Sequence, residues 1–198
     1  MASHKGPGLE PRELTDPRTM RAIAHPLRIA LLELLAIEGP LTATEAGERL
    51  GESPANCSFH LRQLAKYGFV EEAGAGPGRN RPWRVISLGL TATDVGGGAE
   101  SAIALQALEG LLVDRWMGRI QHWMRTRHSY PREWQDAAGI TQSLLYVTPD
   151  ELREVLAELI PLLMRHAERF RDRAQRPAGA LPVEVVAFAY PLAPHPEE

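Results

Sequence analysis

Residues 42–84 read TATEAGERLGESPANCSFHLRQLAKYGFVEEAGAGPGRNRPWR, and start and stop signals inside this stretch predict two helices joined by a tight turn. Thr42 and Glu45 form a capping box at the start of the first helix, because each side chain can satisfy a backbone N–H of the other residue. Gly51 suits the left-handed conformation that ends a helix. The first helix is therefore expected to run from 42 to 50.

The second helix begins at Ser53 and Pro54, since serine is a favoured N-cap and proline at the first helical position loses no hydrogen bond. We expect it to end near Tyr67. The 100° step of an α-helix divides its side chains between two faces. The inward face carries Cys57, Leu61 and Leu64. The outward face and its flanks carry Ala55, Asn56, Ser58, Phe59, Arg62, Gln63 and Lys66.

This outward face has donors, one aromatic ring and no carboxylate. A solvated helix usually mixes both signs of charge, whereas a helix in the major groove must keep carboxylates away from phosphates. Amide, guanidinium and apolar groups are the ones that meet base edges there. The helix over residues 53–67 is therefore expected to read DNA.

Residues 69–88 predict a β-hairpin, because two short β runs flank a glycine-rich tip. The alternating glycines are not a dinucleotide-binding loop, since a strand rather than a helix follows them. The polar residues beside the tip are Arg79, Asn80, Arg81 and Arg84. The arginines could contact phosphates or enter the minor groove, and the alternative is a solvated hairpin with basic decoration. Together with the two helices, the hairpin indicates a winged helix-turn-helix.

Over residues 17–88 the chain resembles the arsenic-repressor-like (ArsR) winged-helix regulators. The matching segments are HPLRIALL at 25–32, LTATE at 41–45, SFHLRQL at 58–64 and GFV at 68–70. The resemblance implies a transcriptional regulator that binds double-stranded DNA. It also implies DNA contacts from Asn56, Ser58, Phe59, Arg62 and Gln63, to which the face of the helix adds Lys66 as a phosphate contact.

Metal sensing, which many members of that family perform, lacks its usual ligands in this chain. The first reading helix contains no cysteine. Asp114, His122 and His128 lie on one expected helix, but their spacing departs from the i,i+3 or i,i+4 spacing of ligands on one helix. Ordinary surface histidines are the favoured interpretation. We expect neither a metal nor another cofactor.

Three further residues have structural and functional interpretations. His60, at the helix-packing boundary, is better explained as an imidazole bonded to a backbone carbonyl than as a ligand. His25 precedes a proline at a helix junction, where a structural cap is the commoner role. Cys57 is the only cysteine, so neither a disulfide nor a dithiol switch within the chain is possible.

The charge of the chain is uneven. The 198 residues have a net charge of −3, but residues 53–90 hold five Lys and Arg against two Asp and Glu. Attraction to DNA depends on this local field within a Debye length of ~8 Å. No apolar run approaches the ~20 residues that span a bilayer, and the N-terminus lacks a signal-peptide core, so a cytoplasmic protein is expected.

The domain division follows from composition and helix signals. Residues 1–15 are expected to be a flexible tail, and residues 16–90 the winged helix-turn-helix domain, which opens with helices at Asp16–Pro17 and at Pro26. Residues 91–98 are a glycine-rich linker by composition. Residues 99–198 are expected to be an α-rich region for dimerisation and possibly effector binding. The fold class is therefore mainly α with a small β-wing.

The helix expected over residues 99–128 has an apolar surface wider than one core stripe requires. We expect it to pack on its own domain and on a second copy, giving a two-fold homodimer that reads a palindromic operator. The expected interface residues are Leu108, Leu112, Trp116, Ile120 and Trp123. The alternative is that residues 143–190 cover the surplus face within one chain.

Farther along, residues 143–147 and 183–190 are expected to be two short strands around a helix that starts at Pro149 and kinks at Pro161. Four aromatic residues could line a pocket for a small-molecule effector or simply fill the core and the interface. They are Trp116, Trp123, Trp134 and Tyr146.

Three classes of function are compatible with a winged helix-turn-helix. A DNA-binding regulator is favoured, and an enzyme is not expected, because no nucleophile elbow, P-loop, metal triad or paired carboxylates appear. The alternative is a winged-helix module that contacts protein or RNA, since fold alone does not determine function. Replacing Arg62 with alanine discriminates between these classes.

Overall fold

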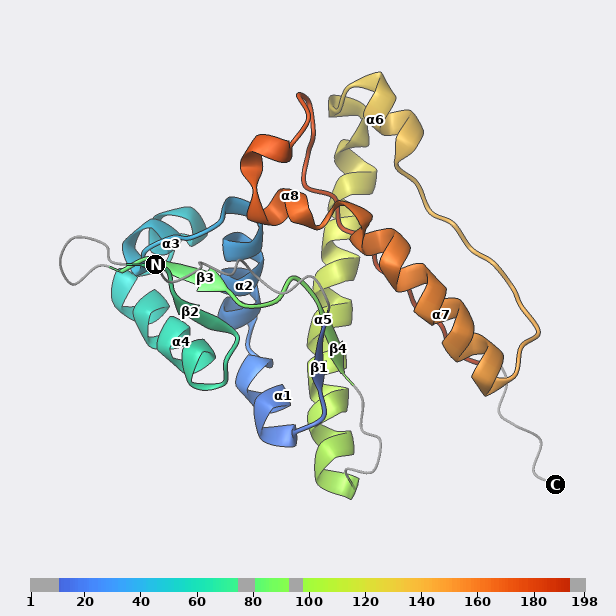
Figure 1. Cartoon of the computed structure of the whole chain (residues 1–198), viewed down its shortest axis with the longest axis horizontal. Coiled ribbons are helices and arrows are strands. Elements are labelled where there is room, and N and C mark those ends of the chain that lie inside the picture. The colour runs from blue at the N-terminus through green and yellow to red at the C-terminus, as the bar shows by residue number, and fades with distance from the viewer. Residues whose placement is uncertain (1–10, 75–80, 93–97, 193–198) are drawn as a thin grey trace.

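The computed structural model describes residues 11–74, 81–92 and 98–192 (Figure 1). The strands are β1 (Arg12–Leu14), β2 (Val70–Glu72), β3 (Trp83–Val85) and β4 (Leu90–Ala92). The first helices are α1 (Pro17–Ile23), α2 (Pro26–Glu38), α3 (Ala43–Leu50) and α4 (Pro54–Lys66). The later helices are α5 (Gly98–Thr126), α6 (Arg132–Ala137), α7 (Pro149–Leu163) and α8 (Glu168–Arg171), with 3-10 turns η1 (Arg127–Ser129), η2 (Met164–His166) and η3 (Arg173–Gln175).

Side-chain caps set the starts of the platform helices α1 and α2. The Asp16 carboxylate accepts the backbone N–H of Thr19 at 2.9 Å, and Pro17 follows as the first residue of α1. His25 caps α2, because its Nδ1 accepts the N–H of Leu27 at 3.1 Å. The structural interpretation of His25 as a cap is thus confirmed.

The hydrophobic core lies among α1–α4, the β2–β3 hairpin and the first half of α5. Its largest fully buried side chains are Leu14, Met20, Ile23, Leu31, Leu35, Leu61, Leu64, Val70 and Leu108. The first half of α5 packs against α1, and Figure 1 shows α1–α4 together on one side of that long helix. The helix-turn-helix unit and α5 therefore share one core.

Two segments at the edges of this unit differ from expectation. β1 and β4, which lie in the expected tail and at the start of the expected linker, pair in parallel, with Arg12 opposite Leu90 and Leu14 opposite Ala92. Leu14 is 1% exposed. Burial of this side chain favours an ordered strand over a free tail, because it removes apolar surface from water.

Ion pairs hold α5 against α2. Glu33 accepts from the Arg115 Nε at 2.8 and 2.9 Å and pairs with the Arg119 Nη1 at 2.8 Å. Arg119 also pairs with Glu184, which belongs to the extended C-terminal segment at 180–192. These partly buried contacts join three parts of the chain that lie far apart in sequence.

The expectation of strands at 143–147 and 183–190 was wrong. Both segments lie within the described residues, and neither forms a strand. Their apolar runs suit a sheet, but a β-strand also needs a neighbour for its N–H and C=O groups, and neither segment has such a partner within the described chain.

Helix α7 starts at the expected capping box, where the Thr148 N–H donates to Glu151 at 2.7 Å. It ends at Leu163, two residues beyond Pro161, and η2 follows. Pro161 thus lies inside α7, where its missing backbone N–H removes one hydrogen bond of the helix. None of the described helices is long and apolar enough to cross a membrane.

Candidate nucleic-acid interface

The turn between α3 and α4 is tight, as the capping signals predicted. The Thr42 N–H donates to the Glu45 carboxylate at 2.8 Å, and Gly51 ends α3 with φ of 69°. A Cβ at Gly47 would lie 2.6 Å from the carbonyl oxygen of Glu52, so only glycine fits this close approach. Ser53 then caps α4 by accepting the N–H of Asn56 at 3.2 Å.

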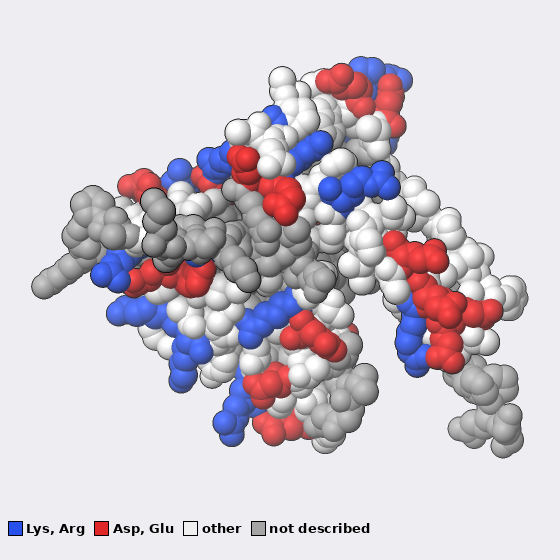
Figure 2. Space-filling view, viewed as in Figure 1, with Lys and Arg blue, Asp and Glu red and all other residues white. Residues whose placement is uncertain are grey.

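The two faces of α4 lie as its helical periodicity predicted. Cys57, Leu61 and Leu64 are fully buried, while Arg62 and Lys66 are exposed and Phe59 is 52% exposed. Figure 2 shows basic side chains at the lower left of the molecule, where α4 lies in Figure 1. The outward residues of α4 thus form an exposed surface, which we call the reading face: Phe59, Arg62 and Lys66.

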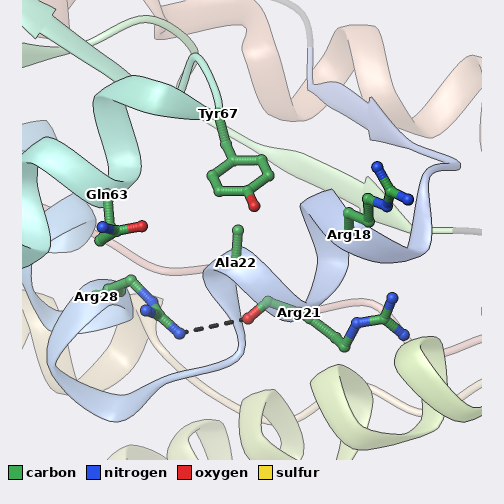
Figure 3. A pocket seen from close by; sticks show the side chains of 6 residues that line it. All are labelled: Arg18, Arg21, Ala22, Arg28, Gln63 and Tyr67. Carbon is green, nitrogen blue, oxygen red and sulfur yellow. Dashed lines mark hydrogen bonds between the residues drawn. The ribbon is translucent and has the colours of Figure 1, made fainter.

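The flanks of the reading face are half-buried and partly engaged. Asn56 Nδ2 donates to Glu52 Oε2 at 2.9 Å, and Arg62 Nε donates to the carbonyl oxygen of Ser58 at 3.2 Å. Gln63 lies on the flank that faces α1 (Figure 3). Glu52 was missed by sequence reasoning, because it precedes the helix and lies outside the face that periodicity defines.

The β2–β3 hairpin is the wing, with Glu71 opposite Arg84 and Glu72 opposite Trp83. Arg84 pairs with Glu71 at 2.8 Å, and Arg81 pairs with Glu72 at 2.7 Å. These arginines were expected either to contact DNA or to decorate a solvated hairpin, and in the structure both pair with carboxylates of β2. Opposed positions on neighbouring strands bring such side chains together. Arg79 and Asn80 lie outside the described residues.

Arg12 is a functional-site neighbour that sequence reasoning missed. Its guanidinium donates to the carbonyl oxygens of Gly68 at 2.7 Å and Tyr67 at 2.8 Å, and it lies 4.3 Å from the centre of the Phe69 ring. Arg12 therefore anchors the chain just after α4. The sequence does hold a signal for this residue: Arg12 precedes Leu14 in a short run where polar and apolar residues alternate, inside the expected tail.

His60 does not behave as the favoured interpretation predicted. Its ring lies 4.4 Å from the His25 ring, and its buried Nδ1 has no hydrogen-bond partner among the described residues. Burial, followed by the nearby His25 and Arg28, lowers the pKa of His60. The expected bond to a backbone carbonyl is thus not made at Nδ1. The neutral imidazole is favoured in this environment.

Cys57 lies in the core, whereas Asp114, His122 and His128, which were considered as metal ligands, are exposed. Cys57 is free and buried, and burial raises the pKa of its thiol. Within the part of the chain that the structure describes, no group of three or more His, Cys, Asp or Glu side chains is placed to hold a metal ion.

The expected dimer-interface residues on α5 fall into two groups. Leu108 is fully buried in the core of its own chain, so its side chain is not available to a partner. Leu112, Trp116, Ile120 and Trp123 are half-buried. Trp116 contacts Phe188 edge-on at 5.7 Å, so the C-terminal segment covers part of this surface within one chain.

Of the four aromatic residues considered for an effector pocket, Trp116 makes that contact with Phe188, and Trp123 and Trp134 are half-buried. Tyr146 is fully exposed, so its ring lines no enclosed cavity in this chain.

Residues 23–73 match a family model described as a helix-turn-helix domain. No curated protein matches the chain. The match agrees with the observed fold, in which α3 and α4 form a helix-turn-helix unit that is followed by the β2–β3 wing.

Two solved structures resemble the chain. One is the crystal structure of the AntR antimony-specific transcriptional repressor, at 24% identity over 60% of this chain and 99% of that chain, with a TM-score of 0.35. The other is a cysteine-to-serine mutant of ZitR from Lactococcus lactis, at 16% identity over 84% of this chain and 87% of that chain, with a TM-score of 0.28. Likenesses of this size carry no conclusion about effector or assembly.

Proposed function

We propose that this protein is a sequence-specific transcriptional regulator that binds a palindromic operator as a homodimer and acts by binding rather than by catalysis. The observation that carries the proposal is the reading face of α4. Phe59, Arg62 and Lys66 are exposed on a helix that contains no Asp or Glu. Such a surface suits base edges and phosphates in the major groove.

Contacts along its inner face and at both ends hold α4 in place. Its inner face is packed in the core, Ser53 caps its start, and Arg12 binds the two carbonyl groups that follow its end. A helix held at both ends keeps its backbone in one position relative to the domain, which specific recognition requires.

The homodimer is supported by apolar side chains that the single chain leaves exposed. On α5 these are Val113, Met117 and Met124, and in the C-terminal region they include Leu144, Leu145, Tyr146, Val183, Val185 and Tyr190. Helix α7 buries none of its residues and extends away from α5 (Figure 1). A monomer rarely exposes so much apolar surface, and a second copy of the chain would cover it.

Selection of bound sites from random DNA duplexes with purified full-length protein tests the proposal. We expect an enriched palindrome whose half-sites lie about one helical turn, ~34 Å, apart. Enrichment of an asymmetric single site would contradict the dimer, and no enrichment would favour the protein- or RNA-contacting alternative. The Arg62→Ala variant, run in parallel, should change the base preference within each half-site.

A further inference from the structure

A hollow of about 250 Å³ lies beside the reading helix, between α1 and the end of α4. Its lining residues are Arg18, Arg21, Ala22, Arg28, Gln63 and Tyr67. Figure 3 shows the Tyr67 hydroxyl pointing toward Ala22, with Gln63 and Arg28 on one side and the Arg18 and Arg21 guanidinium groups on the other. Every lining side chain except Ala22 carries an N–H or O–H donor, and the described lining includes no carboxylate.

The positive charge of this hollow is only partly compensated. Arg21 pairs with Glu100 at 2.5 Å, and both side chains are largely exposed. The side chains of Arg18 and Arg28 pair with no carboxylate in the described parts of the chain. The hollow therefore holds an excess of guanidinium groups next to a helix that presents no acidic side chain.

Among the guanidinium groups of this hollow, Arg28 has a buried nitrogen without a hydrogen-bond partner in the described residues. Its Nη2 reaches the carbonyl oxygen of Arg21 at 3.3 Å, which is a long hydrogen bond, and its buried Nε has no partner among the described residues. Burial lowers the pKa of Arg28. A buried charged donor without an acceptor is unfavourable, and an anion would relieve that cost.

Gln63 and Tyr67 add neutral donors to the same space. The Gln63 amide and the Tyr67 hydroxyl make no hydrogen bond with other described residues, so both are free to donate to an acceptor in the hollow. Planar guanidinium groups combined with amide and hydroxyl donors match the oxygen atoms of phosphate and carboxylate.

We propose that this hollow binds a single phosphate or carboxylate group, with Arg28 as its central ligand and with Gln63 and Tyr67 as further donors. Gln63 belongs to α4 and Tyr67 follows its last residue, so an anion held here would tie the end of the reading helix to α1 and α2. The group has two possible sources with the same chemistry: a phosphate of the DNA backbone or a free small anion.

The first arm of the test uses inorganic phosphate and needs no DNA. Full-length wild type, Arg28→Met and Arg18→Met are titrated by calorimetry and melted in phosphate and in chloride at matched ionic strength. Phosphate should bind and stabilise the wild type, and Arg28→Met should weaken that binding about tenfold or more. Arg18 is exposed, so Arg18→Met keeps the fold and should weaken binding in the same direction. Arg132→Met, on exposed α6, is the matched control.

The second arm identifies the source from the salt dependence of binding to a random-sequence duplex. If the hollow binds a phosphate of the DNA backbone, Arg28→Met should reduce the salt slope of DNA binding by about one unit. If it binds a free anion instead, Arg28→Met should lose phosphate binding and keep the wild-type salt slope. Equal phosphate binding in wild type, Arg28→Met and Arg18→Met, together with unchanged slopes, would overturn the site. Wild type that binds phosphate but no duplex would instead refute the proposed function and leave the site standing.

Discussion

Arg62 and Lys66 lie one helical turn apart on the reading face, and we expect them to contribute differently to binding. Arg62→Ala should reduce discrimination between the selected site and a scrambled one by ~1–3 kcal/mol, which is the loss expected for a bidentate base contact. Lys66→Ala should instead weaken all sequences alike and flatten the salt dependence by about one unit. Fluorescence anisotropy at several salt concentrations measures both quantities.

The control for these variants is Arg125→Ala, which removes an exposed charge from the end of α5, away from the reading face. It should leave discrimination and salt dependence as in the wild type. Wild-type discrimination and salt slope in both Arg62→Ala and Lys66→Ala would rule out α4 as the reading helix.

The neighbouring rings of His25 and His60, whose centres lie 4.4 Å apart, predict a pH dependence of stability. Burial lowers the pKa of both side chains below their ordinary value of 6.5. The unfolded chain therefore binds protons at a higher pH than the folded chain, so the free energy of unfolding should fall as the pH drops below about 6.5. The slope is at most ~1.4 kcal/mol per pH unit for each proton. Urea denaturation at pH 7.5 and 5.5 measures the change.

The His60→Phe variant should lose part of this pH dependence, since it removes one of the two titrating groups. Carboxylates with lowered pKa, such as Asp16 and Glu45, start from ordinary values of 3.8 and 4.5 and act at lower pH, so they do not obscure this window. Replacement of the exposed His122 with glutamine serves as the control. A pH dependence in His60→Phe equal to that of the wild type would refute the assignment.

In the wing, the carboxylates of β2 pair with Arg81 and Arg84. This pairing limits how far the two arginines are free to contact DNA. Removing Arg79 and Arg81 together should cost DNA affinity far more than stability, because Arg81 is exposed and its surface ion pair contributes little to folding. Trp83→Ala should do the reverse. Trp83 packs against the core, and its backbone N–H and C=O both bond to Leu41, at 2.7 and 3.0 Å. Urea denaturation and anisotropy, measured on the same samples, separate the two effects.

Glu72 provides a second test of the wing. Because it pairs with Arg81 at 2.7 Å between exposed side chains, Glu72→Gln should release Arg81 and tighten DNA binding by roughly up to fivefold. The salt slope should steepen at the same time. Unchanged affinity in Glu72→Gln and in the double arginine variant would mean that the hairpin does not contact DNA.

For the molecule as a whole, we predict that exposed apolar residues of α5 hold two chains together. Met117→Glu combined with Met124→Glu should dissociate the dimer and abolish palindrome binding, because each charge would be buried without a partner at the interface. Both positions are exposed in the single chain, at 37% and 51%, so their replacement spares the core. Sedimentation velocity at micromolar concentration measures the assembly.

Leu112 is a less decisive position for this test, since it packs partly against the core of its own chain. Gln121→Glu, an exposed polar position on α5, is the matched control and should remain dimeric. Wild-type protein that sediments as a monomer and still binds one half-site would refute the dimer.

The local sequence was sufficient to predict the helix-turn-helix unit. Capping residues such as Thr42 and Ser53, and the break at Gly51, act through neighbouring backbone groups, so their effects can be predicted without tertiary contacts. The faces of α4 followed from helical periodicity for the same reason.

Contacts between distant residues could not be predicted in this way. Three such contacts depend on how separate elements pack. They are the ion pair of Arg81 with Glu72, the hydrogen bonds of Arg12 beside α4 and the contact between the rings of His60 and His25. The prediction of two C-terminal strands failed for a related reason, since apolar runs indicate a preference for sheet but supply no neighbouring strand. Local signals determine helices and their ends, whereas charge compensation, strand pairing and the hollow beside α4 arise when the folded chain brings distant residues together.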